Sequence, residues 1–493
     1  MFYHSPLRPL RLNILIFLVL AAAITAGSAA AQQSESRPGS TARQPSPPNI
    51  IFILIDDLGW SDVGYQYSDH HQDDGYFETP AIDALAARSL IFTNGYANAP
   101  NCAPSRACLM SGQWPQRHGI YTVGTAARGK AKQRRIVPVE NETTLGDRFI
   151  TLGEALSQQG YQTAAIGKWH LGDSPTTQGF QLNIAGNHWG SPSGGGYLSP
   201  LDYPNLKVDQ PNICLTDCLT EAAEDFIEQN KHRPFFLYLA HYAVHTPLQP
   251  KPLLLEKYRL KEKTDTQTNA KYAAMIENVD QSVASVWNKL SQLNLEDDTI
   301  LVFSSDNGGH MGATSNHPLH GAKGMLYEGG IRVPLTIRWP KHLKTGHCDV
   351  PVQGIDLYPT LLSMAGLQRP ENYPLDGQDI SAVFTGDQSE IDKLNQRPLY
   401  WHFPAYLEGK GDPSGGPFRT TPASSVRIGD WKLIQWYEDG RKELYNLKED
   451  LAETQNRINS DPETASQLTR QLHQWLEQTD AFLPTQPNPK YSK

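Results

Sequence analysis

Three carboxylates and one amide stand directly after two apolar runs that are far apart in the sequence. These residues are Asp56, Asp57, Asp306 and Asn307. The first pair follows Asn49–Ile55, and the second follows Ile300–Phe303 and two serines. All four side chains offer oxygen, which Ca²⁺ and Mg²⁺ prefer, whereas zinc would require His or Cys in the set. The Asp-Asp pair alone is more typical of a solvated turn or a helix cap. Together, the two pairs predict a site for Ca²⁺ or, as a second choice, Mg²⁺.

Cationic and imidazole side chains follow two further apolar runs. Thr163–Ile166 leads to Lys168 and His170, and Phe235–Ala240 leads to His245. A single lysine is usually a solvated surface charge, and a single histidine is usually a structural residue. Strands commonly end in polar loops, so one such end would mean little. Here, however, all four runs end in such residues. The first run ends in two carboxylates, the second in Lys and His, the third in His, and the fourth in Asp and Asn. This combination favours a common site.

A cysteine precedes a segment with a strong helix-start pattern. Pro104 suits the first turn of a helix, and helix formers follow it, so Cys102 is expected just before the helix N-terminus. The amide groups and the macrodipole at that end favour an anion, and Arg106, one turn further, can bind a tetrahedral oxyanion. These features predict an activated thiolate beside an oxyanion site. The alternative is an ordinary buried cysteine at a helix start.

The elements that must position these groups form an α/β alternation. Runs that are apolar on both faces suit strands buried in a parallel sheet, and amphipathic stretches such as Tyr272–Leu293 suit the helices between them. In open α/β sheets, ligands bind outside the carboxyl ends of the strands. We therefore expect a mostly parallel sheet flanked by helices, with the four polar strand ends at one edge.

The pattern changes after Gly366, where a Pro- and Asn-rich connection leads to short alternating segments. The expected β segments and the closing helix are Pro398–His402, Ser425–Ile434, Leu444–Leu447 and Pro462–Thr479. They predict a smaller C-terminal subdomain with an antiparallel sheet. The expected division is a catalytic domain at residues 48–370 and a C-terminal subdomain at residues 371–493.

The N-terminus has the pattern of a secretory signal peptide. Arg8 and Arg11 precede the apolar run Leu12–Ala26, and small residues lead to a cleavage site after Ala31. The run is shorter than the roughly 20 residues of a membrane span, so no stable anchor is expected. Residues 1–31 are predicted to be removed and residues 32–47 to be a linker. The mature protein is then expected in the periplasm or outside the cell.

Composition and charge exclude several classes of protein. The chain is 39% hydrophobic and 19% charged, which excludes a disordered, fibrous or multi-span membrane protein. Its formal net charge of −9 opposes a broad nucleic-acid-binding face. The five cysteines are Cys102, Cys108, Cys214, Cys218 and Cys348. Export permits disulfides, and Cys214 and Cys218 are close enough for a local bridge or are simply buried thiols.

The cysteine segment resembles the signature of the formylglycine-dependent (type I) sulfatase family, in the alkaline-phosphatase-like superfamily. The signature Cys-x-Pro-Ser-Arg and its Ser-Gly continuation are present as Cys102, Pro104, Ser105, Arg106, Ser111 and Gly112. Further blocks are similar to the family's: Ile55–Gly59, Thr79–Asp83, Gly167–Gly172, His245–Pro247, Ser305–Gly309, Gly321–Gly330, Gly429–Leu433 and Glu443–Leu447. One departure is Gln113, where the family commonly has the arginine that ends the signature.

The resemblance implies a reaction and a role for each residue. A maturation enzyme oxidises Cys102 to formylglycine, whose hydrate is the nucleophile, and four cysteines remain. Ca²⁺ is held by Asp56, Asp57, Asp306 and Asn307 together with the modified Cys102. Arg106, Lys168 and Lys323 offset the charge of the sulfate oxygens. His170 acts on the formylglycine hydroxyl, and His245 protonates the leaving alcohol.

Two segments suggest how a sugar could be bound. The glycine-rich stretch Gly186–Tyr197, which contains His188 and Trp189, and the aromatic segment around His402 could line a sugar pocket, although aromatic clusters are more often core. Their similarity to other sulfatases favours an exo-acting carbohydrate sulfatase, with His402 as a substrate-binding residue. The alternatives are a phosphomonoesterase or phosphonate hydrolase of the same fold and a non-catalytic glycan-binding homologue.

Overall fold

An eight-stranded sheet forms the centre of the protein in a computed structural model that describes residues 47–71, 75–409 and 416–492. Its strands, in spatial order, are β11 (Gly346–Cys348), β2 (Leu90–Phe92), β10 (Leu335–Arg338), β9 (Thr299–Ser305), β1 (Asn49–Ile55), β8 (Phe235–Ala240), β4 (Gln162–Gly167) and β5 (Leu182–Ile184). Neighbouring strands are parallel except at β10, which is antiparallel to both β9 and β2. The predicted mixed, mostly parallel sheet is therefore confirmed.

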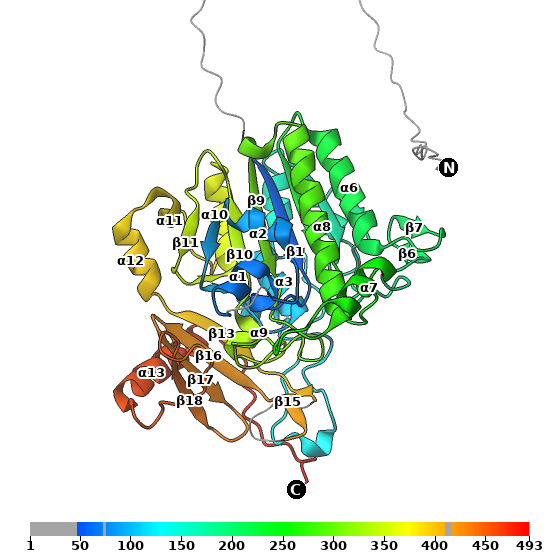
Figure 1. Cartoon of the computed structure of the whole chain (residues 1–493). Coiled ribbons are helices and arrows are strands. Elements are labelled where there is room, and N and C mark those ends of the chain that lie inside the picture. Colours follow the sequence, from blue (N-terminus) through cyan, green and yellow to red (C-terminus); the bar gives the residue numbers. More distant parts are fainter. Residues whose placement is uncertain (1–46, 72–74, 410–415, 493) are drawn as a thin grey trace, which may run out of the picture. The chain divides into compact units, whose positions relative to one another are not determined.

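Helices cover both faces of this sheet because β1 is apolar on both sides. Ile51, Ile53 and Ile55 pack in one core with α6 (Leu215–Asn230) and α8 (Ala270–Gln292). The alternate residues Ile50, Phe52 and Leu54 pack in a second core with α3 (Cys102–Ser111), α5 (Leu152–Ser157) and α10 (Gly354–Met364). Figure 1 shows α6 and α8 side by side on one side of the sheet. Successive side chains of residues 50–55 point into two different apolar cores. This burial on both faces is the physical reason why this part of β1 has no polar residue.

The four strands that were expected to carry the polar ends are neighbours, in the order β9, β1, β8, β4. Ile55 is in register with Ser305, Leu54 with Ala240, and Ala240 with Gly167. Because these strands are parallel and in register, their carboxyl ends lie at the same edge of the sheet. Asp306 follows β9, Asp56 follows β1, and Lys168 follows β4 at that edge.

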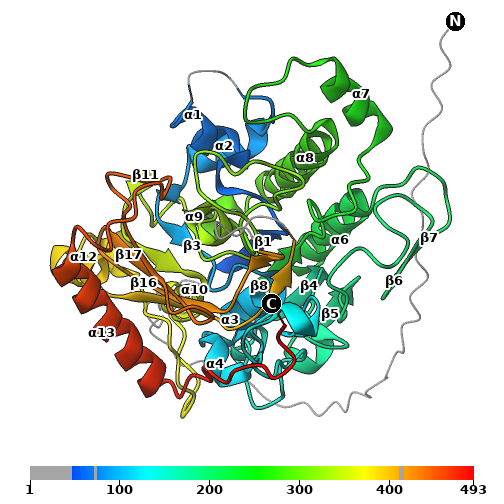
Figure 2. The same cartoon turned by 90° about the horizontal axis from the view of Figure 1, so that it is seen from below.

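A second, four-stranded antiparallel sheet follows in the C-terminal part. Its spatial order is β13 (Leu399–Phe403), β16 (Ala423–Ile428), β17 (Trp431–Trp436) and β18 (Lys442–Asn446), and α13 (Pro462–Gln478) packs against β16 and β17 (Figure 2). The expected segment Ser425–Ile434 is in fact a hairpin, because Gly429 adopts a positive φ of 56° between the two strands. The division at residues 370 and 371 stays a prediction, and Ile380 and Leu394, beyond it, pack in the core of the large sheet.

Some expectations fall outside the described residues. The predicted signal peptide, residues 1–31, and all of the predicted linker, residues 32–47, except Pro47 lie there. Within the described part, no helix is both long enough and apolar enough to span a membrane. All five cysteines are free thiols. Cys214 and Cys218 do not form a bridge, and the Cys214 thiol instead donates to Asn278 Oδ1 at 3.1 Å.

Candidate active site

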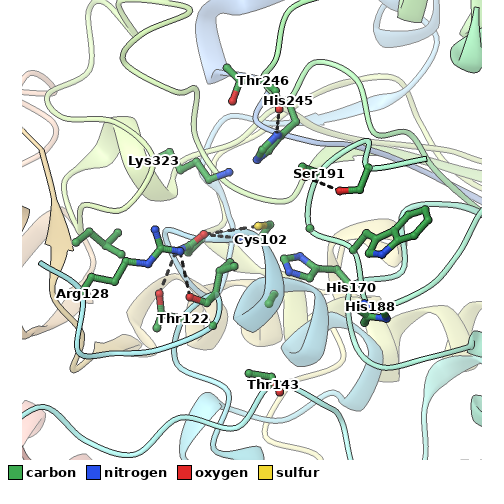
Figure 3. Close-up of a pocket in the computed structure, with 18 of the residues that line it drawn as sticks. Cys102, Thr122, Arg128, Thr143, His170, His188, Ser191, His245, Thr246 and Lys323 are labelled. Atoms are coloured by element: carbon green, nitrogen blue, oxygen red, sulfur yellow. Dashed lines mark hydrogen bonds between the residues drawn. The ribbon is translucent and has the colours of Figure 1, made fainter. Parts of the chain in front are cut away.

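A cavity of about 780 Å³ lies at the predicted edge of the large sheet. Cys102, His170, His245 and Lys323 line it, and Figure 3 shows their side chains converging on one point. Six further predicted residues do not line the cavity but are buried beside these four. They are Asp56, Asp57, Arg106, Lys168, Asp306 and Asn307, each 2% exposed or less. The structure therefore brings together ten of the eleven residues predicted for the site.

Cys102 was expected just before the helix, and it is instead the first residue of α3. Asn101 is the N-cap, and its Oδ1 accepts from the Cys102 amide at 3.0 Å. Burial raises the pKa of the Cys102 thiol, and the nearby Lys168 and Lys323 only partly oppose this effect. Burial of the unmodified thiol thus opposes the expected activation, which stays a prediction.

Arg106 is held in a fixed orientation one turn into α3. Its Nε donates to Asp306 Oδ2 at 2.8 Å, and its Nη1 donates to the Lys168 carbonyl at 2.8 Å. Both charged side chains of this ion pair are fully buried. Nη2 is also buried and has no hydrogen-bond partner in the described part of the chain. Nη2, an NH2 group with two N–H donors, is therefore the part of the guanidinium that these contacts leave unused.

The acidic residues are tied to one another and to two lysines. The Asp57 amide donates to Asp306 Oδ1 at 3.2 Å, and Asn307 Nδ2 donates to Asp57 Oδ1 at 2.8 Å. Lys168 Nζ lies 2.6 Å from Asp56 Oδ2, and Lys323 Nζ lies 2.5 Å from Asp57 Oδ1. The positions of these carboxylates are therefore set by hydrogen bonds and ion pairs from four separate strand ends and loops.

The donor set fits a hard divalent cation. Asp56 Oδ1, Asp57 Oδ2 and Asn307 Oδ1 are buried and lack hydrogen-bond partners among the described residues, which is costly unless a cation binds them. Ligand atoms of Asp56, Cys102 and Asp306 all lie within 4.8 Å of one another. Three carboxylates face three cationic side chains, so an added divalent cation would make the site net positive, as an anionic substrate requires.

The carboxylates respond differently to this environment. Burial raises the pKa of Asp56 to about 7, with Lys168 opposing the shift and Asp306 and Asp57 adding to it. Burial acts in the same direction on Asp57, but Lys323 and His245 reverse it and lower the pKa of Asp57 below its ordinary value. The pKa values of these neighbouring carboxylates therefore depend on the cationic side chains beside them.

Two of the site residues have left-handed backbone conformations. The φ angles are +64° at Asp57 and +63° at His170, a region that non-glycine residues seldom adopt. Such a conformation costs about 1–3 kcal/mol and is retained where the surroundings impose it, often at functional sites. Asp57 lies two residues after the end of β1, and His170 lies three residues after the end of β4, so both conformations occur at the same edge of the large sheet.

His170 and His245, two of the four histidines that line the cavity, have pKa values below the ordinary one. Burial lowers the pKa of His170 well below its ordinary value, and Lys168 and Arg106 add to this shift. Gly190 lies against the His170 ring, where a Cβ would stand 2.6 Å from Nε2. Burial also lowers the pKa of His245 to about 3, although Asp57 opposes it. His245 Nδ1 donates to the Thr246 carbonyl at 2.5 Å, which leaves Nε2 free of a proton and 3.8 Å from Asp57 Oδ2.

The structure does not bring His402 to the cavity. Its side chain is buried, with Nδ1 2.7 Å from Ser424 Oγ and Nε2 3.3 Å from the Phe482 carbonyl. The prediction that His402 contacts substrate is corrected on this ground, because both ring nitrogens are occupied within the C-terminal part. The glycine-rich stretch fits its prediction better, since His188, Trp189 and neighbouring residues line the cavity.

Several cavity residues were missed in the sequence. Arg128, Asp173, His310 and Arg419 line the cavity together with Thr122 and others. His310 follows the block Ser305–Gly309 directly, and this position could have identified it as a residue of the site. Arg128 and Arg419 lie in segments without a strand-end pattern, so sequence reasoning had no basis for selecting them.

Comparison with known proteins agrees with this geometry. A family model described as "Sulfatase" matches residues 48–367, and one described as "N-sulphoglucosamine sulphohydrolase, C-terminal" matches residues 317–481. A "Sulfatase" of Formosa agariphila is 33% identical, over 88% of this chain and 89% of that protein. N-acetylgalactosamine-6-sulfatase of Homo sapiens is 32% identical, over 73% of this chain and 69% of that protein.

A solved structure has the same architecture over most of its length. The crystal structure of Ps i-CgsB is similar with a TM-score of 0.70 and 30% identity, over 90% of this chain and 95% of that chain. The fold, the buried acidic centre and these matches agree with one another. The chain belongs to the sulfatase family, within the alkaline-phosphatase-like superfamily, and is a sulfuric ester hydrolase.

Proposed function

We propose that this enzyme hydrolyses sulfate esters of sugars with a formylglycine made from Cys102 and with Ca²⁺ bound at the acidic centre. The observation that carries the proposal is the position of Cys102, which lines the cavity and has its ligand atom within 4.8 Å of those of Asp56 and Asp306. A hydrated formylglycine at this position would supply the nucleophilic hydroxyl. Bound Ca²⁺ would supply Lewis-acid stabilisation of sulfate oxygens.

The side chains of the chain itself then have distinct tasks. Asp56, Asp57, Asp306 and Asn307 would hold the cation through the oxygens that lack other partners. The Nη2 of Arg106, which lacks a partner among the described residues, and the ammonium groups of Lys168 and Lys323 would bind the sulfate oxygens. Lys323 suits this task because Asp57 raises its pKa although burial lowers it.

The two histidines would handle protons on opposite sides of the sulfate. A neutral His170 can accept a proton from a hydroxyl of the residue at position 102, since its Nδ1 is buried without a partner. His245 would donate a proton to the leaving alcohol from Nε2. Because the free protein holds this imidazole neutral, the negative charge of a bound ester would be needed to stabilise its protonated form.

A carbohydrate substrate is supported by the cavity and by the relatives. The cavity has room for a sugar beside the sulfate and includes Trp189, whose ring packs against Tyr203. One similar protein is named N-acetylgalactosamine-6-sulfatase. Ps i-CgsB has been solved in complex with k-i-k-neocarrahexaose, and that chain is 29% identical to this one. We further propose that the enzyme is exported and that a maturation enzyme modifies Cys102.

The test is mass spectrometry of the peptide that contains Cys102, on protein made with a maturation enzyme, together with sulfate release from an aryl sulfate and from sulfated oligosaccharides. The mass decrease for replacement of the thiol by an aldehyde, with sulfate release, is expected. An unmodified Cys102 and no sulfate release despite a competent maturation enzyme would contradict the proposal. A phosphate monoester in the panel tests for phosphatase activity.

A matched pair of cysteine variants tests whether sulfate release depends on the Cys102 thiol specifically. Cys102→Ala should abolish sulfate release without lowering the melting temperature by more than a few degrees. Cys108→Ala removes a buried thiol of the same helix, where Sγ is 3.5 Å from His118 Nε2 and does not line the cavity. This control should keep both the modification and the activity.

A further inference from the structure

Two arginines that the proposed reaction does not use line the same cavity. Arg128 lies in the loop after Thr122, and Arg419 lies in β15 (Phe418–Thr420), far away in the sequence. Figure 3 shows Arg128 on the side of the cavity opposite His188. Two like charges repel, so their convergence on one cavity requires an explanation.

The structure presents Arg128 from a firmly held loop. The Arg134 guanidinium donates from Nη1 to the carbonyls of Ala127, Arg128 and Gly129 at 2.7, 3.0 and 2.8 Å. Ala127 also forms a bridge with Tyr406. The loop backbone is therefore fixed on both sides, and the Arg128 side chain starts from a defined point.

Arg419 is placed next to the reacting centre by an antiparallel ribbon. β15 pairs with β14 (Leu407–Glu408), and Leu407 also lines the cavity. A Cβ on Gly324, the residue after Lys323, would stand 3.3 Å from Arg419 Nε. The Nε group is buried, and no described residue accepts a hydrogen bond from it. Burial lowers the pKa of Arg419, and Arg128 adds to this shift.

Two carboxylates act on this pair: Asp57 and Glu408 oppose the lowering of the Arg419 pKa but do not reverse it. Glu408 Oε1 lies 4.0 Å from Arg128 Nη1, and both side chains are substantially exposed, so the ion pair is weak. The opposite wall differs: Asp173 is fully exposed, and its Oδ1 is 3.6 Å from His188 Nδ1. One wall is thus suited to an anion and the other to sugar hydroxyls.

We propose that Arg128 and Arg419 form a subsite for a second anionic group, a sulfate or a carboxylate, on the carbohydrate whose sulfate ester is cleaved. This inference rests on the proposed function, and it narrows the substrate class to carbohydrates with at least two anionic groups. The arginines would select such substrates by charge-assisted hydrogen bonds, and they would not take part in the chemical step.

The test compares kcat/KM for pairs of substrates that differ only in the second group. One arm uses a disaccharide of a hexuronate and N-acetylgalactosamine 6-sulfate against its uronate methyl ester. The other arm uses a disulfated galactose disaccharide against its monosulfated form, and the two arms distinguish carboxylate from sulfate. The wild-type enzyme should prefer the dianionic member of at least one pair.

Arg128→Gln and Arg419→Gln should each lower that preference roughly tenfold, mainly through KM. The matched control is Arg470→Gln, which removes an exposed arginine of α13 and should keep the preference. A merely structural role would lower kcat/KM for both members equally and keep their ratio. An unchanged ratio in both arms, or a wild-type enzyme without a preference, would overturn the proposal.

Failure of the proposed function gives a different result. If no sulfate ester in the panel is cleaved, calorimetric binding of the same disaccharides still measures the subsite. A roughly tenfold increase in Kd for the dianionic disaccharide in the Gln variants would support the subsite. An equal Kd in the wild type and the variants would contradict it.

Discussion

Arg106 Nε donates to Asp306 Oδ2 at 2.8 Å, with both side chains fully buried. This contact joins the first turn of α3, where Cys102 lies, to the end of β9, which carries a predicted metal ligand. The same guanidinium donates to the Lys168 carbonyl after β4. One side chain therefore connects the helix of the residue proposed as nucleophile, the predicted metal ligand Asp306 and Lys168, the lysine proposed to bind sulfate.

We predict that Arg106→Lys keeps the charge but loses this geometry. A lysine carries its three N–H donors on one nitrogen and cannot reproduce the separate positions of Nε, Nη1 and Nη2 from which the guanidinium makes its contacts. The kcat for an aryl sulfate should fall by roughly 10²–10³-fold, as when a preorganised donor is lost. Steady-state kinetics on protein with a verified Cys102 modification measures this. Activity within threefold of wild type would show that the geometry is dispensable.

Removal of divalent cations should reduce both activity and stability. The buried oxygens of Asp56, Asp57 and Asn307 would lose their proposed cation partner when a chelator is added. At a Ca²⁺ concentration of about 100 Kd, binding stabilises the fold by about 2.7 kcal/mol. Differential scanning fluorimetry with EGTA, Ca²⁺ and Mg²⁺ should show a rise in melting temperature that is largest with Ca²⁺.

Asp57→Asn should abolish that rise, and Asp202→Asn, at an exposed position of β6 (Leu201–Tyr203), should retain it. Melting curves that are identical with EGTA and with Ca²⁺ would contradict the assignment of the acidic centre as a cation site.

A buried ion cluster should connect stability of the small sheet to the active-site region. Lys432 Nζ in β17 donates to Glu328 Oε1 and Glu453 Oε1, each at 2.9 Å, and all three side chains are fully buried. Glu328 begins α9 (Glu328–Ile331), which follows the Lys323 loop. Lys432→Met would leave the buried Glu453 without its cation and Glu328 with Arg332 as its remaining partner, and it should cost about 3–5 kcal/mol.

Thermal unfolding measures this cost. The exposed Lys448→Met is the control and should change the melting temperature by less than two degrees, roughly the effect of a neutral surface substitution. A Lys432→Met protein as stable as the control would show that the cluster does not hold the two parts together.

Acid should destabilise the protein in part through His402. Burial lowers the pKa of His402 to about 4 from an ordinary value of 6.5. Because the folded protein binds this proton more weakly than the unfolded chain, the stability that the neutral ring contributes is full above pH 6.5. It is lost as the pH falls from 6.5 toward 4, and the loss is about 2 kcal/mol at pH 5.

His402→Gln removes this titration, so its melting temperature should fall less between pH 7 and pH 5 than that of the wild type. The exposed His232 provides the control His232→Gln, which should keep the wild-type pH dependence. Equal pH dependence in His402→Gln and wild type would refute the buried, neutral state of His402.

Much of the centre could be predicted from the sequence because its chemistry is local to strand ends. A strand that is apolar on both faces, such as Asn49–Ile55, must be buried in a sheet, and the first polar residues after it must emerge at the carboxyl edge. Asp56, Lys168 and Asp306 were therefore placed correctly without any knowledge of contacts. The Cys102 signature could also be identified from the sequence, because its residues lie together at the start of one helix.

Other features depended on contacts between distant segments, which only the tertiary structure decided. His402 lies in an aromatic run that resembles a sugar platform, but pairing of β13 with β16 places its ring against Ser424, inside the protein. Arg128 and Arg419 reach one cavity because a loop docks on a separate ribbon. The raised pKa of Cys102 likewise depends on burial, and burial is a property of the assembled neighbours, not of the residue and its position in the chain.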